Sequence, residues 1–87
     1  MDLEQKAKKL GATELGLSGT KTKRFYVIYN NKIINFGAKN AKTFIDHGDI
    51  FLRKNWRARH MKIMKNGAPA YKDKTSASYW AYHVLWN

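Results

Sequence analysis

The sequence contains no cysteine among its 87 residues. Disulfide bonds and thiolate zinc sites are therefore excluded, and the absence fits a reducing compartment. A domain of this size buries a limited fraction of its surface, so it needs good packing or a partner for stability. Without disulfides, we expect a second copy of the chain to supply that stability as a homodimer.

Long apolar runs are missing as well. No segment approaches the roughly 20 apolar residues that a membrane-spanning helix requires. The first residues, MDLEQKAKKLGA, contain no apolar core followed by a cleavage site, so no secretory signal is indicated. We expect a soluble, non-secreted protein without a membrane span.

Acidic residues are scarce: six Asp and Glu stand against 17 Lys and Arg, and the net charge is +11. The positive charge is densest in RKNWRARHMKIMK, from Arg53 to Lys65, where aromatic and apolar residues interleave with it. Such a surface attracts polyanions, and nucleic-acid phosphate is the commonest one. The alternative is that the charge only keeps a small aromatic-rich protein soluble.

The segment FYVIYNNKIINF, residues 25–36, predicts a β-hairpin, because Asn30-Asn31 tolerates the positive φ angles of a two-residue turn. In this register one face is apolar and must pack on helices, while the other invites a third strand or a second subunit. We expect the third strand at Pro69 to Lys72. The predicted cross-strand pairs are Phe25 with Phe36, Val27 with Ile34, Ile28 with Ile33, and Tyr26 with Asn35.

Two helices are predicted after the hairpin. Asp49 caps the first, which runs to about Lys65 and stops at Asn66-Gly67. Thr75 or Ser76 caps the second, SASYWAYHVLWN, whose apolar residues surround it completely. A helix without a polar face is buried, so we expect it in the core of the domain and of the dimer.

The predicted architecture is α+β, a small antiparallel sheet packed by two helices in one domain over residues 23–87. Residues 1–22 are expected to form a flexible or partly helical arm, because glycines interrupt them. The expected core and dimer-interface residues are Tyr79, Trp80, Val84, Trp86, Ile28 and Ile33.

Four blocks, KRFYVIYNNKIINFG, TFIDHGD, RKNWRARHMKI and SASYWAYHVLWN, together resemble a family of small basic proteins of large nucleocytoplasmic DNA viruses and their relatives. The resemblance spans residues 23–87. It implies a viral protein of the giant-virus group, present in the virion and in the host cytoplasm or nucleus during infection. It implies no activity, because that family has no established one.

The residues themselves favour nucleic-acid binding through phosphate contacts, because guanidinium groups fork onto phosphate oxygens. No helix-turn-helix pattern precedes the basic helix, so binding without strong sequence preference is expected. Alternatively, Arg57 and Arg59 pair with Asp46 or Asp49 and pack over aromatic rings. The candidate phosphate-binding residues are Arg53, Lys54, Arg57, Arg59, Lys62, Lys65, Lys21, Lys23 and Arg24.

Other chemistry is less well supported by the sequence. Asp46 and His47 with Asp49 resemble a metal cluster superficially, but the three histidines, His47, His60 and His83, lie on separate elements without the short spacings of a metal site. We interpret these residues as caps and structural histidines and expect no metal, cofactor or catalytic site. Most aromatics are expected in the core, with Tyr26 and Tyr29 as candidates for base stacking. The competing function is a structural or interaction protein, such as a capsid cement or an adaptor for an acidic viral or host protein.

Overall fold

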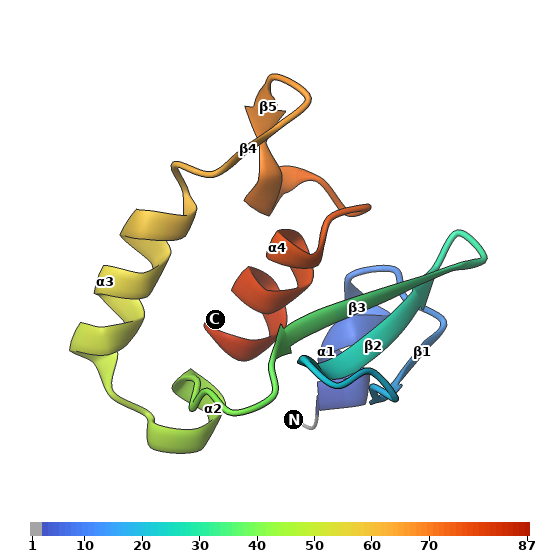
Figure 1. The fold of residues 1–87 in the computed structure, drawn as a ribbon, viewed down its shortest axis with the longest axis horizontal. Helices are drawn as coiled ribbons and strands as arrows, with labels where there is room; N and C mark the ends of the chain where they lie inside the picture. Colours follow the sequence, from blue (N-terminus) through green and yellow to red (C-terminus); the bar gives the residue numbers. More distant parts are fainter. Residues whose placement is uncertain (1–2) are drawn as a thin grey trace.

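The computed structural model describes residues 3–87, and its C-terminal helix lies between a sheet and an outer helix (Figure 1). An α+β fold is confirmed. Within this range the three-stranded sheet has the order β1-β2-β3, and a second sheet consists of β4 and β5. The elements are α1 (Leu3–Lys9), β1 (Glu14–Leu17), β2 (Lys23–Tyr29), β3 (Lys32–Ala38), α2 (Phe44–His47), α3 (Ile50–His60), β4 (Met64–Lys65), β5 (Ala68–Pro69), the 3-10 turn η1 (Ala70–Lys72), α4 (Ala77–Trp80) and its π-helical continuation η2 (Ala81–Leu85).

The β2–β3 hairpin forms as the sequence predicts. Asn30 and Asn31 adopt φ angles of 50° and 60°, which a two-residue turn of this handedness requires. Every predicted cross-strand pair is confirmed, from Phe25 opposite Phe36 to Ile28 opposite Ile33. Phe25, Val27 and Phe36 are buried on the face that packs against helices.

The third strand was predicted in the wrong place. Strand β1 pairs antiparallel with β2, with Leu15 opposite Val27. Ala68–Pro69 instead pairs with Met64–Lys65 in a separate small hairpin, and Ala70–Lys72 forms a 3-10 turn. Proline has no amide hydrogen to donate to a ladder, so Pro69 suits this peripheral strand better than the sheet.

The N-terminal segment, expected as an arm, packs with the rest of the chain. Ala7 of α1 is fully buried and Ala12 is nearly so, both within the main hydrophobic core. Leu15 of β1 packs against the same core. Lys74 anchors the segment further by donating from Nζ to the Leu10 carbonyl at 2.8 Å. Residues 3–17 therefore pack into the same hydrophobic core as the β2–β3 hairpin and the C-terminal helix.

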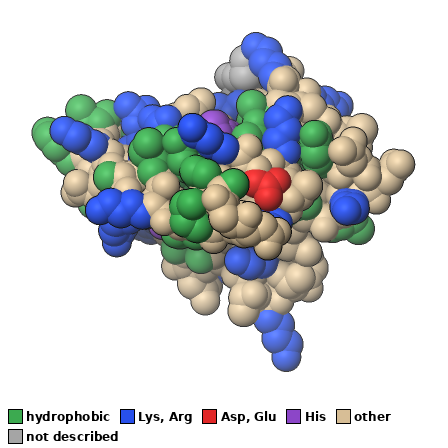
Figure 2. Space-filling model, turned by 90° about the horizontal axis from the view of Figure 1, so that it is seen from above, with side chains coloured by type: hydrophobic (Ala, Val, Ile, Leu, Met, Phe, Trp, Pro, Cys, Tyr) green, Lys and Arg blue, Asp and Glu red, His purple; other side chains and the backbone are tan. Residues whose placement is uncertain are grey.

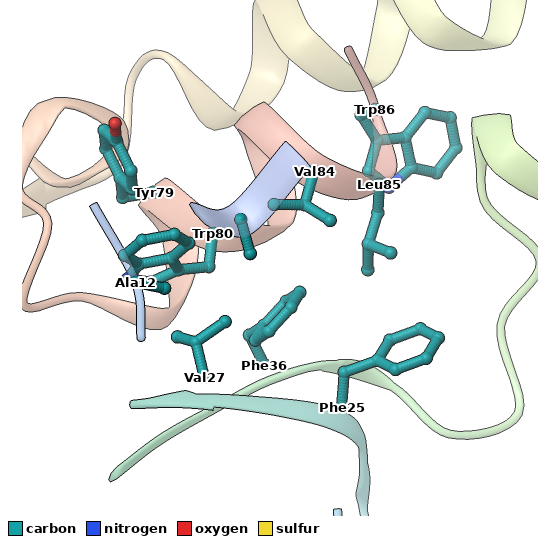
Figure 3. Close-up of a cluster of buried hydrophobic side chains, with 10 residues drawn as sticks. Ala12, Phe25, Val27, Phe36, Tyr79, Trp80, Val84, Leu85 and Trp86 are labelled. Atoms are coloured by element: carbon teal, nitrogen blue, oxygen red, sulfur yellow. The ribbon is translucent and has the colours of Figure 1, made fainter. Parts of the chain in front are cut away.

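The C-terminal helix is buried, as its all-round apolar pattern predicts. Trp80, Val84 and Leu85 are fully inaccessible and face Val27 and Phe36 of the hairpin (Figure 3). The Trp80 indole donates to the Lys74 carbonyl at 2.8 Å, so its one polar atom is satisfied. Ser76 caps the helix by accepting from the Tyr79 amide at 3.2 Å.

The expected interface residues divide between the core and the surface. Tyr79, Trp80, Val84 and Trp86 are buried within a single chain and belong to its hydrophobic core. Ile33 is 67% exposed on the outer face of the hairpin. Dimerisation stays a prediction.

Helix α3 begins as predicted and ends early. The Asp49 carboxylate accepts from the amides of Phe51 and Leu52 at 2.9 and 3.2 Å and so caps the helix. The helix ends at His60, not near Lys65. Asn66 and Gly67, expected as its stop, form the turn between β4 and β5 with φ angles of 53° and 82°. The same dipeptide serves a hairpin turn or a helix end, which explains the wrong boundary.

Burial of Ala7 gives a direct test of how the N-terminal segment packs. Ala7→Gln should lower the free energy of unfolding by about 2 kcal/mol or more, because a larger polar side chain must enter a filled apolar site. Lys9→Gln places the same residue at an exposed position of α1 and should change stability by no more than about 0.5 kcal/mol. Urea denaturation monitored by circular dichroism measures both. Equal stabilities would show that α1 does not pack into the core.

Candidate nucleic-acid interface

Helix α3 carries the densest positive charge, and it has no buried residue. Arg53, Trp56, Arg57 and His60 are half-buried, while the other residues of the helix are exposed. These four positions fall at spacings of three and four, so they form one seam along the helix. The helix therefore contacts the body of the protein along a narrow line, with open surface on both flanks.

Trp56 is the anchor of this seam. Its ring stacks on His60 with centroids 3.7 Å apart and on Trp86 with centroids 4.8 Å apart, at interplanar angles of 15° and 7°. A hydrogen bond of 3.0 Å between His60 Nδ1 and the Trp56 carbonyl fixes the imidazole. The Trp86 amide bonds to the Ala81 carbonyl across the π-helical turn, which holds the end of the chain against α3. We call His60, Trp56 and Trp86 the aromatic stack.

A cleft of about 520 Å³ lies on one flank of α3, between this helix, the C-terminal helix and the connector after β3. We call it the stack cleft, because all three rings of the aromatic stack line it. Its volume falls in the range of small-ligand sites. A neighbouring hollow shares Lys42, Arg59 and Trp86 with it and extends toward His47 and Leu52. The flank is therefore a groove rather than an isolated pit.

Lys23 from β2, Lys42 from the connector and Arg59 from α3 also line the stack cleft. No carboxylate lines it within the described residues. Across residues 3–87, the salt bridges that form involve Lys8, Arg24 and Lys65, and none involves these three cations. The cleft is thus a positively charged site without an internal counter-charge.

Ser78 adds a polar group to this cleft. Its hydroxyl oxygen is buried and makes no hydrogen bond to any described residue. It lies among apolar lining residues, including Ala77, Ala81 and Leu85. A buried hydroxyl without a partner costs free energy, so Ser78 is an unsatisfied polar group beside the cleft.

The predicted cations on the other flank of α3 form a separate group. Arg53, Lys54 and Arg57 line a second cleft of about 510 Å³ with Ile50 and Met61. Arg53 lies over the Phe44 ring at 4.5 Å and Arg57 over the Tyr82 ring at 4.6 Å. The predicted packing of arginine over aromatic rings is therefore confirmed for Arg57. The basic residues of α3 do not make one continuous surface.

Arg24 is held by an ion pair. Its guanidinium donates to both oxygens of Asp46, at 2.7 and 2.9 Å. Together with the Thr43 backbone amide, which donates to Asp46 at 2.7 Å, this pairing holds the pKa of the Asp46 carboxyl far below its usual range. The expectation that Asp46 or Asp49 pairs with Arg57 or Arg59 is wrong, because Asp46 takes Arg24 and Asp49 caps α3.

The remaining predicted cations differ in their surroundings. Lys65 lies 3.7 Å from the Asp73 carboxylate and donates to the Thr75 hydroxyl at 3.3 Å, so its charge is partly balanced. Lys21 and Lys62 are exposed and do not line the stack cleft, the neighbouring hollow or the second cleft. Of the predicted set, only Lys23 and Arg59 meet at the stack cleft.

The histidines take part in structural contacts. His47 Nδ1 accepts from the Asp49 amide at 2.9 Å, and His83 Nε2 contacts the Tyr71 carbonyl at 3.1 Å. Burial lowers the pKa of His83, and the charges of Arg57 and Lys74 lower it further, although the Tyr71 carbonyl opposes them. Within residues 3–87, no three His, Cys, Asp or Glu side chains gather as a metal site would require.

The tyrosines singled out for base stacking lie elsewhere. Tyr29 packs against Trp80 with centroids 5.9 Å apart and belongs to the edge of the core. The Tyr26 hydroxyl donates to Glu14, and its ring lies so close to Gly16 that a Cβ there would approach it to 2.7 Å.

Sequence reasoning missed Lys42, Ser78 and the joining of Trp56 with Trp86. Each signal was too weak alone: Lys42 stands in a polar connector, and the tryptophans were assigned to the core. Only the packing of α3 beside the C-terminal helix brings them to one cleft.

The sequence model of a family of unknown function (DUF5754) matches residues 13–60, more than half of the chain. The chain belongs to this family. The matched segment runs from β1 to the end of α3, so it includes Lys23, Lys42 and Arg59 of the stack cleft. No curated protein and no solved structure matches the chain.

The family assigns neither an activity nor an organism, so the viral origin stays a prediction. Every helix in residues 3–87 is too short or too polar to cross a membrane.

The Arg24–Asp46 pair makes a stability prediction with a defined pH dependence. Asp46→Asn should lower the free energy of unfolding by about 1 kcal/mol at neutral pH, because the bidentate ion pair is removed. Since folding depresses the Asp46 pKa, its stabilisation is fully present above the unfolded-state pKa of about 4 and is lost progressively as the pH falls from there toward the lower folded-state pKa. The difference between wild type and variant should therefore shrink below about pH 4.

Asp49→Asn is the matched control, because it makes the same chemical change three positions away, at the N-cap of α3. Asparagine caps a helix about as well as aspartate, so the cost should be smaller than for Asp46→Asn. Thermal or urea unfolding at several pH values measures both variants. A difference for Asp46→Asn that is constant from pH 7 to pH 3 would refute the ion pair's contribution.

Proposed function

We propose that this protein binds nucleic acid without strong sequence preference, through phosphate contacts at α3 and the stack cleft. The main supporting observation is that Lys23, Lys42 and Arg59 converge on one cleft from different elements and have no ion-pair partner among the described residues. Unpaired cations at a concave site concentrate positive potential there and attract phosphate.

The distribution of acidic residues supports the same proposal. Each acidic side chain in residues 3–87 already has a role: Glu4 pairs with Lys8, Glu14 with Tyr26, Asp46 with Arg24, Asp73 with Lys65, and Asp49 caps α3. Most Lys and Arg charges therefore remain uncompensated. Figure 2 shows blue Lys and Arg side chains spread over one face with little red between them. Such a field favours binding that weakens steeply with salt.

The exposed start of α3 argues against reading of base edges in a duplex. A recognition helix in the major groove uses its N-terminal residues for base contacts. Here those residues are Ile50, Phe51 and Leu52, and they are exposed apolar side chains. They offer no hydrogen-bonding groups to distinguish bases. Phosphate contacts without strong sequence preference are therefore the better form of the proposal.

A second candidate function is that of an interaction protein, such as a virion component or an adaptor for an acidic viral or host protein. Exposed apolar side chains favour it, notably Phe51 and Leu17, which are 74% and 78% exposed. Apolar residues beside cations suit a partner surface that combines carboxylates with apolar anchors. As part of this second candidate function, the protein would form a homodimer through the outer face of the hairpin, at Ile28 and Ile33.

A pair of charge-reversal variants tests the proposed function. Lys42→Glu with Arg59→Glu should weaken binding to labelled DNA by about 10-fold or more. The slope of log K against log salt should also become shallower, by about 0.9 for each duplex phosphate that the protein no longer neutralises. Lys9→Glu with Lys32→Glu changes the net charge equally at exposed positions outside the stack cleft and should have a smaller effect. Fluorescence anisotropy as a function of salt measures both.

Circular dichroism checks that each variant remains folded. An equal reduction of affinity in the two variants would show that the stack cleft has no special part in binding. If the wild type binds neither duplex nor single-stranded DNA at low salt, the proposal fails and the interaction-protein function takes its place.

A further inference from the structure

The stack cleft has properties that phosphate binding alone does not require: a volume of about 520 Å³, aromatic lining residues and a neighbouring unsatisfied hydroxyl. We infer that it accepts one unpaired nucleobase of a single-stranded nucleic acid, with the adjoining phosphates on Lys23, Lys42 and Arg59. This inference rests on the proposed function and specifies the class of nucleic acid.

The geometry of a duplex keeps a paired base out of the cleft. In a duplex, the bases are stacked inside the helix and phosphates form the outer ridge, so a duplex meets the protein with its backbone. A volume of about 520 Å³ is large enough for a small planar ligand. Only a base that is already unpaired, or is flipped out at an energetic cost, would reach the interior.

The walls of the cleft are largely aromatic and apolar, with Trp56 already stacked on His60 and Trp86. The lining combines the rings of Trp56, His60 and Trp86 with the apolar side chains of Ala81 and Leu85. The mutual stacking of these rings holds them in place before a ligand binds, which limits the entropy lost on binding. Contact between bases and aromatic side chains is tolerant of sequence, because every base has an apolar face.

Ser78 suits the polar edge of a base. Its hydroxyl oxygen is buried without a partner, and the residue lines the cleft. A hydroxyl both donates and accepts, so it matches the mixed donors and acceptors of any base without selecting one. This observation is independent of the positive charge; because the oxygen has no exposed surface, a base reaches it only after the Ser78 side chain rotates toward the cleft.

The second cleft also has a buried polar atom without a partner, Arg57 Nε, but a single aromatic residue, Tyr82, lines it. Its Tyr82 ring is covered by the Arg57 guanidinium, and Arg53 covers Phe44 nearby. Its other lining residues, Ile50 and Met61, offer no flat aromatic surface. Arg53, Lys54 and Arg57 are therefore suited to a phosphate outside, while the base enters only the stack cleft.

A variant that fills the stack cleft provides the test. Ala41 is exposed and lines the cleft, so Ala41→Phe should obstruct it without disturbing the core. Ala58 is exposed on α3 and lines the second cleft, so Ala58→Phe is the matched control. The probes are labelled oligodeoxyadenylate, a duplex of equal length and free adenosine monophosphate.

The wild type should bind the single strand about 10-fold more tightly than the duplex, the contribution of roughly one base in contact with aromatic side chains. The single strand should also change the tryptophan fluorescence of the aromatic stack. Ala41→Phe should lower single-strand affinity to that for the duplex and abolish the fluorescence change. Ala58→Phe should retain both the preference and the fluorescence change. Ser78→Ala should weaken single-strand binding several-fold more than duplex binding, which a merely structural serine would not do.

The outcomes separate this inference from the proposed function. Equal affinity for single strand and duplex, with no change in tryptophan fluorescence, would overturn the base pocket and leave phosphate binding intact. Failure of both polymers to bind at low salt would overturn the proposed function itself. Binding of adenosine monophosphate as tight as that of the strand would overturn the strand as ligand and identify a free nucleotide instead.

Discussion

The structure depends on burial of the C-terminal helix against the β2–β3 hairpin. Trp80, Val84 and Leu85 are fully inaccessible, and Val27 and Phe36 meet them from the sheet. Burying side chains of this size contributes about 1.5–3 kcal/mol each, which is large for a chain without disulfides. The close fit extends to the backbone: a Cβ at Gly37 would come within 2.8 Å of Leu85 Cδ1. The N-terminal segment adds Ala7 and Ala12 to this core.

Helix α3 depends on the same core only indirectly, through the ends of the C-terminal helix. It rests on Trp86 through Trp56 and on Tyr82 through Arg57. Because none of its residues is buried, it leaves hollows on either flank. Because α3 contacts the rest of the protein only along a narrow seam, most of its cations stay accessible. The same narrow contact leaves a cleft on each side of the helix. The arrangement that weakens packing thus produces the candidate site.

The sequence predicted the features that local chemistry controls. Asparagine pairs determine the hairpin turn, alternation determines the register, and Asp49 and Ser76 determine where helices start. It did not predict the pairing of β1, because a four-residue strand among glycines has little pattern of its own. It also missed the stack cleft, whose lining comes from β2, the connector, α3 and the C-terminal helix. Convergence of distant segments depends on tertiary packing, which periodicity does not reveal.

Density of charge along the sequence also differs from density of charge in space. The run from Arg53 to Lys65 reads as one basic surface, but the helix directs Arg59 to one cleft and Arg53 and Arg57 to another, and Lys65 pairs with Asp73. Lys42, outside the run, shares a cleft with Arg59. Guanidinium groups that lie over Phe44 and Tyr82 stabilise packing and retain their charge, since an aromatic ring does not neutralise a cation. Those arginines can therefore hold α3 in place and still attract phosphate, whereas Arg24, held by Asp46, serves structure more than binding.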